Sequence, residues 1–77
     1  MRIEINEYIV ADSEICHGQP TFKGTRIMVS IILEMLEEGA NPKQIFEAYP
    51  SINEKHIKSA LQFAAHLAER SFKLMPA

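Results

Sequence analysis

Residues 41–70 read NPKQIFEAYPSINEKHIKSALQFAAHLAER, and this stretch predicts two helices joined by a short turn. Asn41 suits the N-cap of the first helix, Pro42 suits its first position, and Gln44 lies where a capping box needs a glutamine. Pro50 biases the residue before it away from helical geometry, so this helix should end after about two turns. The first helix of the pair is therefore short and has well-defined ends.

The second helix of the pair follows the tripeptide SIN, residues 51–53. Two capping boxes are available for it, Ser51 with Glu54 or Asn53 with His56, and the sequence does not decide between them. Its apolar residues recur at the i, i+3, i+4 spacing of an amphipathic helix: Ile57, Ala60, Leu61, Ala64, Leu67 and Ala68. A short helix, a turn and a longer helix form a helix-turn-helix pattern.

The segment MVSIILEMLEEG, residues 28–39, predicts a further helix before these two. Ile32, Met35 and Leu36 share one face, and Gly39 ends the helix, as glycine does at a C′ position. The opposite face carries Glu34, Glu37 and Glu38. This helix would supply the third wall of a three-helix core.

Residues 2–27 carry strand signals instead. The segments RIEI and YIVA contain alternating or clustered β-branched and aromatic residues, which suit a half-buried sheet. Gly18 and Gly24 interrupt the remainder as turn residues. We predict short strands near residues 8–11 and 20–27, joined as a hairpin.

Together these elements predict a mostly helical α+β protein that forms one domain over residues 1–77. A short N-terminal β-hairpin in residues 1–27 precedes a three-helix helix-turn-helix in residues 28–71, and residues 72–77 form a short tail. The core of so small a domain rarely supplies more than about 3–5 kcal/mol. Since one cysteine cannot form an internal disulfide, we expect a homodimer to supply further stability.

The net charge of −2 argues against broad nucleic-acid binding, because such binding depends on neutralising phosphates. A local basic face on a dimer remains compatible with this net charge. No apolar run approaches the ~18 residues of a membrane span, and the first residues lack the apolar core of a signal peptide. With a single thiol as well, we predict a cytoplasmic protein that makes no membrane contact.

Residues 15–65 contain Ile-Cys, a glycine, a proline and the segment KGTRI, then a helix ending in glycine, a short helix ending in EAYP, and a helix with alanines. This pattern resembles the prokaryotic family known as domain of unknown function 433, whose members look like antitoxins of VapB type; the resemblance covers residues 9–65. It implies a homeodomain-like helix-turn-helix fold and pairing with a PIN-like ribonuclease toxin. The sequence departs from the family pattern at Met28, where proline is usual, and at His17, where many members have a small residue.

The sequence gives little support for a chemical site. Cys16 and His17 are adjacent, so on an extended chain their side chains point to opposite faces and cannot form a nucleophile–base pair. His56 and His66 are ten residues apart on one helix, and there is no Cys-x-x-Cys motif, so we predict no metal site. We therefore expect neither an enzyme, nor a cofactor, nor a small-molecule substrate.

The segment FKGTRI, residues 22–27, has two interpretations. Lys23 and Arg26 could contact a phosphate near free backbone N–H groups at the start of a helix. Alternatively, Gly24 adopts a positive φ and turns the chain, which buries Ile27 and leaves Arg26 bonded to a carboxylate. We favour the structural interpretation.

The outward face at the start of the last helix is a candidate interface for double-stranded DNA. In a helix-turn-helix, the N-terminal residues of the second helix reach base edges, and Lys, Gln and Ser can read them. The predicted DNA-binding residues, two of them from other segments, are Lys55, His56, Lys58, Ser59, Gln62, Lys43 and Arg26. The alternative is an ordinary solvated helix face.

Two functions are compatible with these features. The first is an antitoxin-like protein that binds DNA, represses its own operon and neutralises a PIN-like toxin, although its toxin half rests on the resemblance alone. The second is a protein–protein interaction module that binds the toxin through an apolar helix face or the tail, without contacting DNA. In the tail, Phe72, Leu74 and Met75 are candidate partner-binding residues, and they could equally cover the chain's own core.

Overall fold

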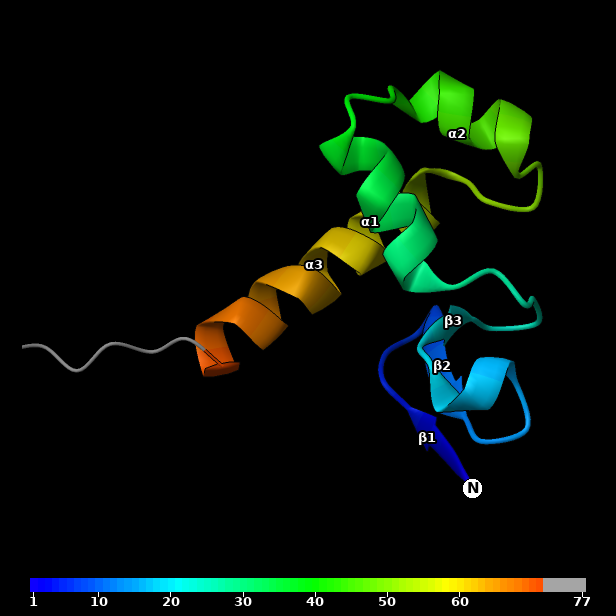
Figure 1. Ribbon diagram of the computed structural model, residues 1–77, viewed down its shortest axis with the longest axis vertical. Helices are drawn as coiled ribbons and strands as arrows, with labels where there is room; N and C mark the ends of the chain where they lie inside the picture. The colour runs from blue at the N-terminus through cyan, green and yellow to red at the C-terminus, as the bar shows by residue number, and fades with distance from the viewer. Residues whose placement is uncertain (72–77) are drawn as a thin grey trace, which may run out of the picture.

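The computed structural model describes residues 1–71, which form a small sheet and three helices (Figure 1). The strands are β1 (Arg2–Glu4), β2 (Ile9–Asp12) and β3 (Thr21–Phe22). The helices are α1 (Val29–Glu37), α2 (Pro42–Ala48) and α3 (Glu54–Ser71). The protein is therefore a small, mostly helical α+β protein, and the predicted fold class is confirmed.

The sheet has three antiparallel strands in the order β1-β2-β3, with Ile3 opposite Ala11 and Ile9 opposite Phe22. The predicted hairpin is present as the antiparallel pair of β2 and β3, but β1 adds a third strand that the prediction lacks. The strand predicted near residues 20–27 is also too long. The chain turns after Phe22, whose N–H donates to the Ile27 carbonyl over 3.1 Å, and Gly24 has a φ of +77° in this turn.

The hydrophobic core lies where the sheet meets the three helices. It contains residues from all three helices and from two of the strands: Ile9, Phe22, Val29, Ile32, Ile45, Ile52, Ile57 and Ala60. The ends of α2 follow the prediction closely. The Gln44 N–H donates to Asn41 Oδ1 over 2.9 Å, and the Asn41 N–H donates to Gln44 Oε1 over 2.8 Å, so the capping box is present.

The C-terminal half of α3 extends away from the sheet and the other helices (Figure 1). Ile57 and Ala60 are buried in the core, whereas Leu61 and Leu67 are 51% and 53% exposed. The apolar stripe predicted for this helix therefore enters the core only over its first turns. Within residues 1–71, no helix has both the length and the hydrophobicity to cross a membrane.

Candidate functional site

Helix α3 begins with Asn53 as its N-cap residue, and His56, three residues later, caps it in return, so of the two pairs that the sequence allows it is Asn53 with His56 that forms contacts. The Asn53 N–H donates to His56 Nδ1 over 3.0 Å, and Asn53 Oδ1 accepts from the Lys55 N–H over 2.8 Å. The His56 ring also packs against two rings of the N-terminal segment, with centroid distances of 5.1 Å to Tyr8 and 5.2 Å to Phe22. Both aromatic contacts have edge-to-face geometry, which is favourable for such pairs.

Two of the predicted DNA-binding residues do not face outward. His56 is half-buried against Tyr8 and Phe22, and Ser59 is only 7% exposed, so the prediction that both lie on the outward face is wrong. The physical reason is helical spacing. His56 and Ser59 share one side of α3 with Ala60 and Phe63, at i, i+3, i+4 and i+7, and this is the side that packs on the rest of the protein.

Protonation of His56 should weaken the fold. Burial lowers the pKa of His56 below its ordinary value of 6.5, and protonated Nδ1 could not accept the Asn53 N–H. Because the unfolded chain then binds a proton more readily than the folded chain, the free energy of unfolding should be highest above that ordinary pKa. It should decrease as the pH falls from there toward the folded pKa.

Two variants of His56 distinguish the loss of its capping hydrogen bond from the effect of its protonation. His56→Gln keeps a neutral acceptor, as Gln44 does for α2, so its unfolding free energy should vary less than that of wild type between about pH 7 and 5. His56→Ala loses the cap and the ring contacts, and we expect a loss of about 1–3 kcal/mol. Urea denaturation across this pH range measures both effects. Equal pH dependence in His56→Gln and wild type would contradict the role given to His56.

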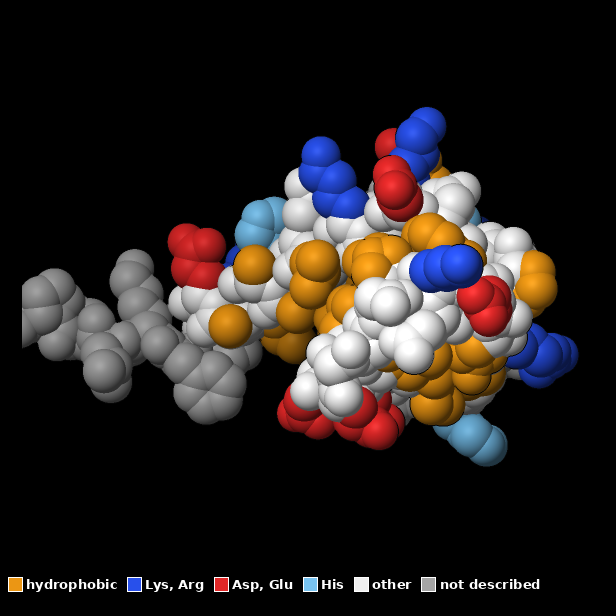
Figure 2. All heavy atoms as spheres, turned by 90° about the horizontal axis from the view of Figure 1, so that it is seen from above, with side chains coloured by type: hydrophobic (Ala, Val, Ile, Leu, Met, Phe, Trp, Pro, Cys, Tyr) orange, Lys and Arg blue, Asp and Glu red, His pale blue; other side chains and the backbone are white. Residues whose placement is uncertain are grey.

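Three of the predicted DNA-binding residues do lie together. Lys55, Lys58 and Gln62 are exposed and follow one another at i, i+3 and i+7, which places them in one row along α3. Lys43 is exposed at the start of α2, and Arg26 is exposed in the turn before α1. On the face seen in Figure 2, lysine and arginine side chains stand at separate places, some beside acidic side chains, and form no continuous basic patch.

The turn that contains FKGTRI has a structural role. Thr25 Oγ1 donates to the Phe22 carbonyl over 2.8 Å and accepts from the Ile27 N–H over 3.0 Å. Lys23 Nζ lies 2.7 Å from the Glu4 carboxylate, so among residues 1–71 the carboxylate contact expected for Arg26 is made by Lys23 instead. These contacts support the structural interpretation of the segment.

The segment around the lone cysteine is a left-handed turn and not an extended strand. The 3₁₀ turn η1 (Cys16–Gly18) has φ values of +49° at Cys16, +56° at His17 and +81° at Gly18. The Cys16 thiol faces the Arg26 carbonyl at 3.5 Å, while His17 is exposed. Among residues 1–71, the Cys16 thiol has its hydrogen bond to the Arg26 carbonyl and none to the His17 ring, which a nucleophile–base pair would require. Within residues 1–71, no three His, Cys, Asp or Glu side chains are grouped to bind a metal.

The exposed half of α3 carries an apolar surface, which we call the distal α3 surface. It consists of half-buried and exposed residues between positions 61 and 68: Leu61, Ala64, Ala65, Leu67 and Ala68. Leu61 and the three alanines lie at i, i+3, i+4 and i+7, and Leu67 flanks them. Since residues 61–68 include no Asp, Glu, Lys or Arg, this part of the helix is suited to an apolar environment.

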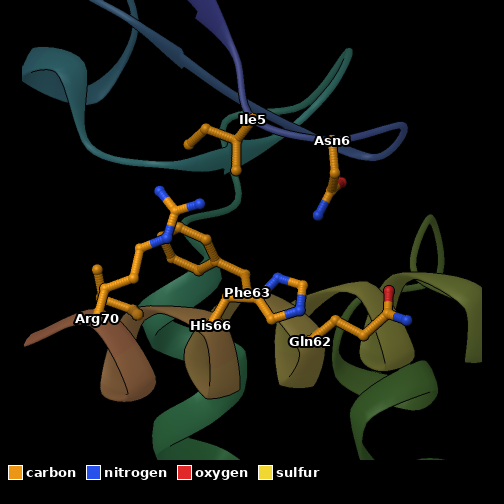
Figure 3. Close-up of a pocket in the computed structure, with 7 residues that line it drawn as sticks. Ile5, Asn6, Gln62, Phe63, His66 and Arg70 are labelled. Carbon is orange, nitrogen blue, oxygen red and sulfur yellow. The ribbon is translucent and has the colours of Figure 1, made fainter. Parts of the chain in front are cut away.

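A hollow of about 350 Å³ lies between the distal part of α3 and the segment that follows β1. In Figure 3, Phe63 lies below Ile5, the Arg70 guanidinium reaches toward Ile5, and Asn6 lies across from His66. Gln62 and Leu67 complete the lining. Leu67 therefore belongs both to the hollow and to the distal α3 surface, which makes the two features continuous.

The sequence predicts that residues 61–70 belong to a helix, but it does not predict the hollow that this helix forms with the segment after β1. The prediction places Leu61 and Leu67 in the apolar stripe of the last helix without saying what covers them, and it assigns Ile5, Asn6 and His66 to no interface. The hollow joins segments from opposite ends of the chain, so local periodicity contains no signal for it. The tail residues Phe72, Leu74 and Met75 lie outside the described residues.

The comparison with protein families identifies the chain. No curated protein and no solved structure matched it. Residues 9–64, which span β2 through most of α3, match the family described as "Protein of unknown function (DUF433)". Because this match covers well over half of the sequence, the chain belongs to the DUF433 family.

Proposed function

We propose that the chain is an antitoxin-like protein that binds a protein partner through the distal α3 surface, and that this partner is a PIN-like ribonuclease toxin. The observation that carries the proposal is the exposure of Leu61 and Leu67, 51% and 53%, on a helix that continues past the core. Removing apolar area from water is worth about 25 cal/mol per Å². A partner that covers both leucines would therefore gain binding free energy without distorting the fold.

The shape of the surface favours an apolar groove as its counterpart. Helices that bind in grooves use anchors at i, i+3, i+4 and i+7, the spacing of Leu61, Ala64, Ala65 and Ala68. The small alanine side chains allow close approach of the partner, while Leu61 and Leu67 supply the larger anchors. The charged residues Glu69 and Arg70 follow directly and would lie at the polar rim of such a contact.

The test begins with the reading frame next to the gene. A PIN-like protein with clustered aspartates encoded there should co-purify with this chain when the two are co-expressed, and its ribonuclease activity should fall in the complex. If the two proteins do not associate and the nuclease stays fully active, the proposed partner is wrong.

DNA binding is a second candidate, and the row formed by Lys55, Lys58 and Gln62 favours it. All three side chains are exposed near the start of α3, the position from which a helix-turn-helix contacts base edges. The net charge of −2 and the separated cations in Figure 2 favour a small footprint with few phosphate contacts. Repression of its own operon would then require two copies on adjacent half-sites.

Charge reversal in this row tests the DNA candidate. We expect Lys55→Glu and Lys58→Glu each to weaken binding to the upstream region of the operon by about tenfold or more and to reduce its salt dependence. Mobility shifts at two salt concentrations measure both effects, and Glu54→Gln, a neutral change next to the row, serves as the control. Wild-type affinity in both lysine variants would show that this row does not contact DNA.

A further inference from the structure

Within residues 1–71, strand β1 is an open edge of the sheet. The strand order is β1-β2-β3, and all three β1 residues, Arg2–Glu4, are exposed. The other edge is different, since Thr21 of β3 forms a bridge with Met28. An uncovered edge strand presents backbone donors and acceptors to another strand.

The backbone groups of Arg2 and Glu4 point away from the sheet. The Met1 carbonyl accepts from the Ser13 N–H over 2.9 Å, and the Ile5 N–H donates to the Ile9 carbonyl over 3.0 Å. Residues 1 and 5 are therefore bonded toward β2. Because backbone groups alternate in direction along an antiparallel strand, those of residues 2 and 4 are directed outward.

The side chains of β1 are complementary to a second copy of the same strand. If two β1 strands pair antiparallel about a two-fold axis at Ile3, Arg2 of each copy lies opposite Glu4 of the other. Arg2 and Glu4 then exchange backbone hydrogen bonds, and the two Ile3 residues meet at the closer, non-hydrogen-bonded position. Opposite charges directly across an antiparallel pair are stabilising, and a two-fold contact of this kind is closed.

We propose that β1 pairs with β1 of a second copy of this chain, which joins the two sheets into one of six strands. This contact does not depend on the toxin or DNA proposals above. It also accounts for the 53% exposure of Ile3, because the second copy would cover that side chain. Arg2 is available for the new contact, since its distances to Glu4 and Asp12 are long, 3.7 Å and 3.9 Å.

Glu4 carries the charge that this contact needs. Its carboxylate accepts a 2.7 Å hydrogen bond from Lys23, and this bond holds the pKa of Glu4 below its ordinary value. Ile5 follows β1 directly and points to the same face of the sheet as Ile3, and it lines the hollow with Phe63, so both copies of α3 would lie on one side of the joined sheet.

The interface is small, so the dimer should be weak. A stable interface buries about 800 Å² on each partner, far more than a three-residue strand offers, so we expect self-association only at high protein concentration. Sedimentation equilibrium up to about 1 mM should show the average mass rise from 8.7 kDa toward twice that value. A mass that stays at 8.7 kDa at every concentration would overturn the proposal.

Charge variants test the register of the pairing. Arg2→Glu makes both charged positions of β1 acidic, and Glu4→Arg makes both basic. Each variant alone places like charges opposite each other twice, so its self-association should weaken by about tenfold or more. An equimolar mixture restores both opposite-charge pairs and should recover the wild-type mass. Recovery on mixing separates a loss of pairing from a folding defect, which circular dichroism of each variant checks independently.

The competing location for self-association is the distal α3 surface, and Leu61→Glu and Leu67→Glu probe it. The proposal predicts that these two variants dimerise like wild type. It is overturned if they become monomeric while Arg2→Glu and Glu4→Arg associate normally, or if mixing the two charge variants gives no recovery.

Discussion

Replacing Phe22 with alanine should leave much of the chain unfolded at room temperature. Phe22 is completely buried, lies in the core cluster and contacts the His56 ring. Removing a buried phenyl group costs about 3–5 kcal/mol, because the transfer free energy is lost and a cavity remains. The core of a domain of this size rarely supplies more than about 3–5 kcal/mol in total, so little stability would be left.

Urea denaturation followed by circular dichroism measures this loss, and Phe46→Ala is the matched control. Phe46 lies on α2 and is only half-buried, so the same substitution there should cost less, about 1–2 kcal/mol. The two variants remove the same atoms from different environments. A Phe22→Ala protein that unfolds at the wild-type urea concentration would show that the contact between sheet and helices does not hold the fold together.

Placing a charge on the distal α3 surface should strongly weaken partner binding without unfolding the chain. We expect Leu61→Glu and Leu67→Glu to weaken binding of the PIN-like protein by about 30-fold or more, as loss of an apolar anchor does in other interfaces. Both leucines are about half exposed, and glutamate forms helices well. The free energy of unfolding should therefore change by no more than about 0.5 kcal/mol.

Lys58→Glu is the control for this experiment. It also places a glutamate at an exposed position of α3, but this position lies outside the distal α3 surface. Titration calorimetry with the PIN-like protein compares the three variants, and the urea midpoint of each reports its fold. If Lys58→Glu weakened the complex as much as Leu61→Glu, nonspecific charge repulsion would explain the effect, and the assignment of the surface would fail.

The sequence predicted the locally determined parts of the fold. The ends of α2 follow from Asn41, Pro42 and Gln44, whose capping and first-turn roles need no information from the rest of the chain. The existence and length of α3 follow from its apolar spacing. By contrast, the alternation in RIEI indicates a strand but not its pairing partner, so the prediction lacks β1 as the third strand of the sheet.

The candidate site was harder to predict, because periodicity shows which residues share a face but not what lies against it. Ile57 and Leu61 belong to one predicted stripe, yet Ile57 is buried and Leu61 is half exposed, since α3 continues past the sheet and the other helices of residues 1–71. The predicted outward position of His56 is wrong for the same reason. Its contacts with Tyr8 and Phe22 come from the N-terminal segment, far away in the sequence.

Amide hydrogen exchange along α3, measured with and without the PIN-like protein, tests most directly whether the helix has a part that packs on the core and a part that binds the partner. In the free chain, amides in residues 61–70 should exchange faster than those in residues 57–60, because the latter lie on the core. Addition of the partner should slow exchange in residues 61–70 strongly. Unchanged exchange there, or protection confined to residues 54–59, would contradict the assignment of the C-terminal half of α3 as the partner-binding surface.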